Sequence, residues 1–102
     1  MSITNNLINT SSTNLYISTG DSAITTVYFC NSSASDRTVQ IYLVESGGSA
    51  TIQNKIYHDL IIPAGDTFIL DTERLILAAA DSLVASCDSS AVVAATISYM
   101  DI

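Results

Sequence analysis

His58 is the residue best suited to acid–base catalysis, because it is the single histidine of the chain. A catalytic base needs a nucleophile or an acid held beside it. Asp59 follows directly, but successive strand residues point to opposite faces, so we expect no catalytic pair there. The chain also has no G-x-S-x-G motif to mark a serine nucleophile. We therefore expect a non-enzymatic protein, with His58 partly buried or at a rim. A small hydrolase with a triad assembled across the fold is the alternative.

Several carboxylates fall in polar segments that could bind a cation: Asp66, Asp71, Glu73, Asp81 and Asp88. Calcium requires several oxygens converging on one loop, and Asp71-Thr72-Glu73 comes closest to that pattern. Asp66 and Asp81 follow Gly65 and Ala80, where an aspartate commonly hydrogen-bonds its own turn. We expect solvated turn acids, with no metal site and no cofactor site.

Two cysteines, Cys30 and Cys87, lie far apart in apolar segments. The sequence has no CxxC motif and no Cys/His cluster, so a zinc site is not supported. We expect two buried free thiols that pack as small hydrophobic side chains. A long-range disulfide between them is the alternative.

Three tyrosines, Tyr28, Tyr42 and Tyr57, could line one face of a sheet. An aromatic surface of that kind could bind a sugar or a protein. Packing in the core or across strands is the expected role. A carbohydrate- or receptor-binding module that stacks ligands on Tyr16, Tyr42 or Tyr57 is the alternative.

The net charge of −7 excludes several partners. Nucleic-acid binding requires clustered lysine and arginine, whereas Arg37, Lys55 and Arg74 are dispersed. Anionic membranes are disfavoured for the same reason. No apolar run approaches the roughly 20 residues of a membrane helix. The first residues lack the features of a signal peptide, so we expect synthesis in a cytoplasm.

The elements that position these side chains read as short strands. β-Branched and aromatic residues, alternation and polar turns predict seven to eight strands. The expected strands are 14–18, 22–30, 37–44, 55–62, 67–71, 72–80, 82–87 and 91–99. Segment 72–80 also contains good helix formers, but we favour a strand with a turn at 79–81. The prediction is an all-β protein, an antiparallel β-sandwich of jelly-roll type.

Finer expectations concern connections and faces. We expect hairpins between strands 22–30 and 37–44 and between the last two strands. Ile56, Leu60 and Ile62 should face the core. Residues 60–70 should form a corner at Pro63-Ala64-Gly65-Asp66, because proline stops strand pairing and glycine accepts a positive φ. Phe68 and Leu70 should anchor that corner in the core.

The chain is expected to divide into an arm and one domain. Residues 1–13 are rich in Ser, Thr and Asn, with few apolar residues to bury. They should form an N-terminal arm, which is loose or becomes ordered on assembly. Residues 14–102 should form a single β-sandwich domain. Ordinary domains carry about 25% charged residues, whereas this chain carries 13%. Such a surface suits a subunit covered by neighbours, so we expect a homo-oligomer, for which a trimer is one form.

Several motifs resemble small virion proteins of tailed bacteriophages, those of cyanophages above all. They are residues 25–31 (TTVYFCN), 37–44 (RTVQIYLV), the Ser46-Gly47-Gly48 loop, 62–67 (IPAGDT) and 98–102 (SYMDI). The resemblance implies a β-sandwich structural protein located in the virion, such as a capsid decoration (cement) protein. It equally allows a component of the neck, tail or fibres. Its implied partners are the major capsid protein or other virion proteins, and it supplies no catalytic residue.

Overall fold

The computed structural model describes residues 2–70 and 75–102. Over these residues the chain forms nine strands and one short 3-10 helix. In chain order they are β1 (Ser2–Leu7), β2 (Thr13–Ile17), β3 (Ser22–Asn31), β4 (Arg37–Val44), η1 (Ile52–Asn54), β5 (Lys55–Ile62), β6 (Thr67–Leu70), β7 (Leu75–Leu77), β8 (Ser82–Cys87) and β9 (Val93–Asp101). The strands expected at 37–44, 55–62 and 82–87 have these bounds.

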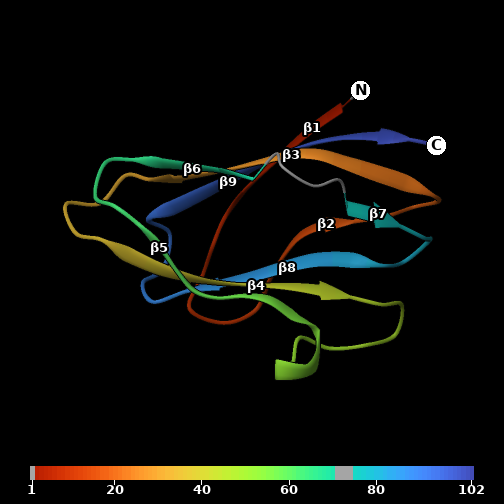
Figure 1. Ribbon diagram of the computed structural model, residues 1–102, viewed down its shortest axis with the longest axis horizontal. Helices are drawn as coiled ribbons and strands as arrows, with labels where there is room; N and C mark the ends of the chain where they lie inside the picture. The colour runs from red at the N-terminus through yellow and green to blue at the C-terminus, as the bar shows by residue number, and fades with distance from the viewer. Residues whose placement is uncertain (1, 71–74) are drawn as a thin grey trace.

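The strands form two antiparallel sheets that lie one above the other (Figure 1). Sheet A has the order β1-β9-β3-β6, and β7 also pairs with β3. Sheet B has the order β2-β8-β4-β5. Every strand pair is antiparallel. The expected all-β antiparallel sandwich is therefore confirmed.

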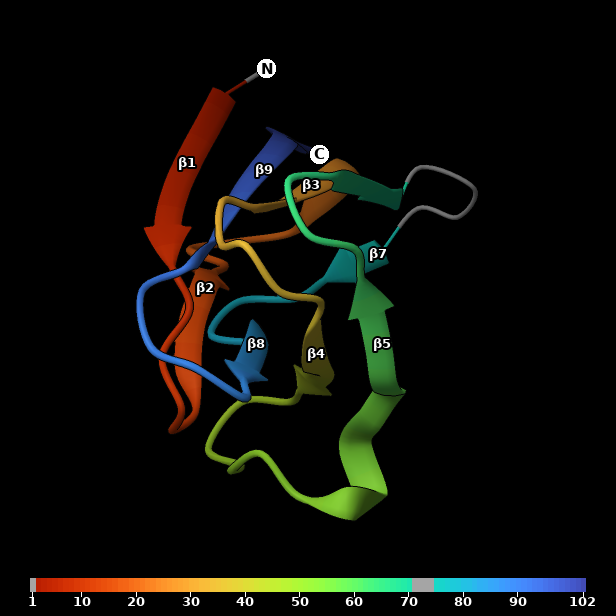
Figure 2. The ribbon, with the colours of Figure 1, turned by 90° about the vertical axis from the view of Figure 1, so that its left-hand side faces the viewer.

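The strand order is that of a jelly roll. β6 and β7 pair with opposite halves of β3, at residues 27–30 and 22–24, so together they occupy one edge of sheet A. Counted this way, each sheet has four positions, and the chain changes sheet at each connection except β4–β5 and β6–β7. Two such interleaved sheets make the two Greek keys of a jelly roll. Figure 2 shows the sandwich from its side.

Both expected hairpins are wrong. β3 lies in sheet A and β4 in sheet B, and β8 and β9 are likewise in different sheets. β3 pairs instead with β9, and β4 with β8, each pair far apart in sequence. A short polar connection fits both a hairpin and a crossing between sheets. The turn residues therefore could not decide between them.

The expected arm is also corrected. Residues 2–7 form β1, which pairs with β9 over six residues without a register shift. Ile8, directly after it, is fully buried in the core. β1 is an edge strand with few core contacts, so its residues can be mostly polar. That polar composition is why residues 2–7 were expected to form an arm. The sandwich therefore begins at β1 and includes most of the expected arm.

The corner at residues 60–70 is confirmed. It carries the chain from β5 in sheet B to β6 in sheet A. The Asp66 amide donates to the Pro63 carbonyl at 3.0 Å, and Gly65 has a φ of +69°. Leu70 is buried, and Phe68 packs edge-on against Tyr57 with ring centroids 6.4 Å apart.

The segment expected as a strand at 72–80 contains β7, which is strand at Leu75–Leu77. Residues 72–74 lie outside the described residues, as does Asp71 at the end of the expected strand 67–71. The turn after β7 is confirmed, because the Asp81 amide donates to the Ala78 carbonyl at 3.1 Å.

The core lies between the sheets and contains fully buried side chains from both, including Phe29, Ile41, Leu83 and Ile97. Leu60 and Ile62 pack in or against this core as expected. Ile56 does not, because it is 41% exposed, while its neighbour Tyr57 turns inward. The pairing of β4 with β5 shifts register twice between Val39 and Tyr42. These shifts break the simple alternation on which the prediction for Ile56 rested.

Candidate interaction surface

His58 and Asp59 are in contact, contrary to the expectation. His58 Nε2 lies 3.3 Å from Asp59 Oδ2. Asp59 has a φ of +51°, which breaks the strand alternation and brings the two side chains together. Both side chains are well exposed, at 68% and 59%. His58 therefore belongs to an exposed rim and not to the core.

The other partners of this pair are polar surface groups. Lys55 Nζ lies 3.0 Å from His58 Nδ1. Gln40 donates to Asp59 Oδ1, and its Oε1 accepts from the Asp59 amide at 3.0 Å. The carboxylate is thus engaged in holding β5 to β4. This arrangement gives Asp59 a structural role in the irregular edge strand.

The turn acids behave as expected where they are described. Asp66 Oδ1 accepts from the Thr67 amide at 2.8 Å. Asp81 accepts from the Ala78 amide at 3.0 Å and from the Ser46 amide at 2.9 Å. Asp71 and Glu73 lie outside the described residues. Within residues 2–70 and 75–102, no three His, Cys, Asp or Glu side chains are grouped for a metal ion.

A depression of about 490 Å³ lies between the end of β4, the η1 segment and β7. Leu43, Asn54, Ile76 and Asp81 are among the residues that line it. Glu45 and Asp81 are the acids of its lining, and both carboxylate oxygens of Asp81 already accept backbone N–H groups. The Asp81 carboxylate is therefore already engaged by the protein backbone.

Both cysteines are free thiols, and only one is buried as expected. Cys87 is buried, and burial raises the pKa of its thiol, with a further increase from the hydrogen bond to the Asp88 carboxylate. Cys30 is exposed on β3. The expectation for Cys30 is wrong because β3 alternates in its second half, so that Phe29 and Asn31 are buried while Tyr28 and Cys30 face out.

The tyrosines do not share a face. Tyr28 is 40% exposed on the outer side of sheet A. Tyr57 packs toward the core, and Tyr16 is buried with its hydroxyl donating to Ser22 Oγ at 3.0 Å. Tyr42 lies on sheet B, with Lys55 Nζ 5.6 Å from its ring centroid. The tyrosines therefore do not form the common aromatic surface that was the alternative, and Tyr57 packs against the core as expected.

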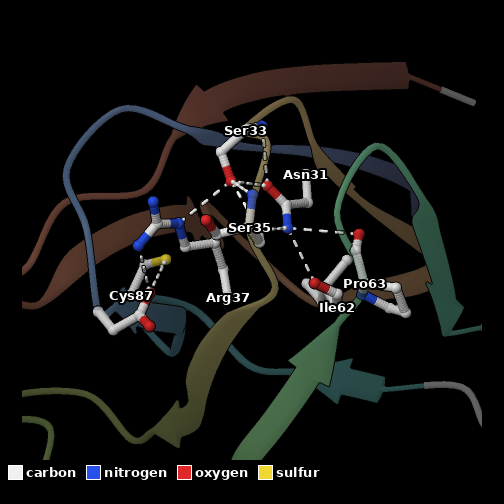
Figure 3. A network of polar contacts seen from close by, with 8 residues as sticks. Asn31, Ser33, Ser35, Arg37, Ile62, Pro63 and Cys87 are labelled. Carbon is white, nitrogen blue, oxygen red and sulfur yellow. Dashed lines mark hydrogen bonds and ion pairs between the residues drawn. The ribbon is translucent and has the colours of Figure 1, made fainter.

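A buried amide, missed in the sequence, ties together one end of the sandwich (Figure 3). Asn31 is fully buried, and its Nδ2 donates to the carbonyls of Ile62 at 2.8 Å and Ser35 at 2.9 Å. Its Oδ1 accepts from the Ser33 amide at 3.0 Å and from Ser33 Oγ at 2.7 Å. One side chain thus joins the β3–β4 connection to the β5–β6 corner. Ser33 Oγ also accepts from Arg37 Nε at 3.1 Å.

The most distinctive surface is the outward side of sheet A, which we call the outer face of sheet A. Its large exposed side chains are Ile3, Leu7, Tyr28, Ile69, Ile76 and Met100. Its polar and small residues are Asn5, Ala23, Thr26, Cys30, Thr67, Ala94, Thr96 and Ser98. Among these outward positions of the five described strands there is no Asp, Glu, Lys, Arg or His.

The register joins these residues into continuous rows. Asn5, Thr96, Tyr28 and Ile69 form one row across four strands. Thr96 Oγ1 donates to Asn5 Oδ1 at 2.9 Å within that row. A second row runs from Leu7 through Ala94 and Cys30 to Thr67. The uncharged surface is thus one continuous patch.

The outer side of sheet B differs in charge. It also exposes isoleucines, with Ile17 52% and Ile61 59% exposed. Its strand β5, however, carries Lys55 and the His58–Asp59 pair. The contrast between the two sides is therefore one of charge, because both expose apolar side chains.

Sequence patterns identify the residues of the outer face of sheet A only in part. Alternation along β3 and β9 separates inward from outward residues. It does not reveal that β1, β9, β3 and β6 are neighbours, and that pairing is what gathers the outward residues into one surface.

Comparisons with protein-family models, with curated proteins and with solved structures give no match. The fold and the surface define the chain as a small jelly-roll sandwich in which the described outward positions of sheet A carry no charge. The resemblance to phage virion proteins is carried by the short motifs quoted above and stays a prediction.

Proposed function

We propose that this protein is a non-enzymatic structural subunit of a phage particle that acts through protein–protein contacts. The observation that carries the proposal is the outer face of sheet A. Six large apolar side chains, each at least 40% exposed, lie on one continuous surface, and the outward positions of its described strands carry no charged residue. Contiguous apolar patches of this kind mark interaction sites more often than single exposed residues do.

Within the particle we propose a capsid decoration (cement) protein, located in the virion. Its partners would be the major capsid protein, other virion proteins and further copies of itself. The motif resemblance supports the virion assignment. The jelly-roll sandwich agrees with it, because this architecture is common in viral capsid domains. Lectins and cupins share the architecture, so the fold alone does not select the function.

A sugar-binding module receives less support from the geometry. Aromatic platforms require rings that face a common space, whereas Tyr16 and Tyr57 pack inward and Tyr42 lies on sheet B. A neck, tail or fibre subunit remains the second candidate. It would use the same outer face of sheet A and differ only in its place on the particle.

Mass spectrometry of purified particles of the virus that encodes the chain tests the proposal. We expect the protein to be present, at a copy number comparable to that of the major capsid protein. A cryo-EM map should then place it on the outside of the shell. A low copy number with density at the neck or tail would favour the second candidate. Absence of the protein from purified particles would contradict both the decoration protein and the neck, tail or fibre subunit.

A further inference from the structure

We propose that the occupant of the outer face of sheet A is a second copy of this chain, packed face to face about a two-fold axis. This inference rests on the proposed function, because it names the partner at the surface through which that function works. Contacts with other virion proteins would then fall to sheet B and to the loops.

Charge is the first argument for a second copy. The chain has a net charge of −7, so two copies repel each other in most orientations. Among the described strands of sheet A, the outward positions carry no acid. Face-to-face packing is therefore an orientation that brings no carboxylates from these outward positions together. A cationic partner would instead be drawn to described acids outside these positions, such as the exposed Asp21, Asp36 and Asp101.

Self-complementarity is the second argument. A two-fold interface places the same surface on both sides, so each of its groups must find a partner within that same surface. Isoleucine and methionine side chains do so by apolar contact. Thr26, Thr96 and Ser98 do so because a hydroxyl both donates and accepts hydrogen bonds. No oppositely charged partner is required at any position of this face.

The available area supports a weak dimer. The fourteen outward residues, on strands about 4.8 Å apart and in rows about 6.8 Å apart, give a face of roughly 460 Å². Two such faces bury about 900 Å², which is in the range of weak and transient interfaces. We expect a dissociation constant in roughly the micromolar to millimolar range. On a particle, where neighbouring copies are held close together, such a contact is strengthened by the high local concentration.

Sedimentation equilibrium of the full chain, from about 10 µM to about 1 mM, tests the inference with a matched pair of variants. Ile69→Asp and Ile61→Asp each replace an exposed isoleucine on an edge strand, in sheet A and sheet B respectively. We expect the wild type to dimerise and Ile69→Asp to weaken the dimer at least about tenfold, because it buries two unpaired carboxylates. Ile61→Asp should leave the dimer unchanged.

Folding of each variant is checked by circular dichroism and by its urea midpoint. If Ile69→Asp fails to fold, Ile76→Asp on β7 replaces it, since Ile76 is 68% exposed on the same face and lies away from the β1 edge. A wild type that is monomeric at all concentrations would overturn the inference. Equal weakening by both variants would do so too, as would weakening by Ile61→Asp alone. Edge-to-edge pairing through β1 would survive Ile69→Asp and would also refute face-to-face packing.

The proposed function is tested separately, by adding the purified protein to particles from which it has been removed and measuring whether it rebinds. A protein that stays monomeric yet rebinds the particles would overturn the dimer and leave the proposed function standing. A protein that dimerises through this face but neither occurs on particles nor rebinds them would leave the dimer standing and overturn the proposed function.

Discussion

Replacing Asn31 by leucine would remove the amide that joins two connections of the sandwich at one end. Leucine has the same branched shape and the same number of side-chain heavy atoms as asparagine, so the change removes every side-chain hydrogen bond of Asn31 while adding only the extra bulk of the methyl groups. The carbonyl of Ile62, a residue that is itself fully buried, would lose the Asn31 donor. The carbonyl of Ser35 and the amide of Ser33 would lose partners in partly buried positions.

The expected loss of stability follows from these contacts. A buried acceptor left without its partner costs about 1–3 kcal/mol, and each partly buried bond contributes about 0.5–1.5 kcal/mol. One of the first kind and two of the second give a loss of about 2–6 kcal/mol in the free energy of unfolding. That is a large part of the roughly 5–15 kcal/mol by which ordinary domains are stable.

Urea denaturation followed by circular dichroism measures the loss. With a slope of about 1.5 kcal/mol per molar urea, the midpoint should fall by roughly 1.3–4 M. Asn14→Leu is the matched control, because Asn14 is exposed on β2, and it should change stability by less than about 0.5 kcal/mol. The reasoning fails if Asn31→Leu costs under about 1 kcal/mol, or no more than Asn14→Leu.

Three further outcomes follow from the structure. In dilute native protein a thiol reagent should modify Cys30 rapidly and Cys87 only on unfolding, because Cys30 is exposed and Cys87 buried; equal rates would contradict these positions. Burial raises the folded-state pKa of Cys87, so its stabilisation should be complete below the ordinary thiol value of about 8.5 and be lost as the pH rises through the raised pKa. Urea midpoints of the wild type and Cys87→Ala between about pH 7 and 10 would show this, and parallel curves would exclude it. Asp81→Ala should lower the free energy of unfolding by about 1–3 kcal/mol, because the Ser46 and Ala78 amides lose their acceptor; an unchanged urea midpoint would count against that role.

The sequence predicted the strands well where the local pattern was strong. β4 alternates over its whole length, and its bounds Arg37–Val44 are those expected. The corner after β5 was also predictable, since Pro63 and Gly65 impose specific backbone angles. Such features depend on neighbouring residues alone.

The pairing of strands was not predictable in the same way. β3 pairs with β9, some 70 residues later, and not with β4. The composition of a polar connection does not determine which sheet the next strand joins. The irregularity at Asp59, with its positive φ, was equally hidden, and it overturned the expectation that the His58 and Asp59 side chains point to opposite faces. The outer face of sheet A depends on this long-range pairing, so alternation alone could not reveal it.

The accessibility of the Cys30 thiol in intact particles tests the central claim most directly. Cys30 lies within the outer face of sheet A, and buried Cys87 serves as an internal control. Purified particles would be treated with a maleimide, and both sites quantified by mass spectrometry before and after dissociation of the particle. We expect Cys30 to be protected in the particle and to react once the protein is released. A Cys30 that reacts as fast in the intact particle as in the free protein would contradict the account.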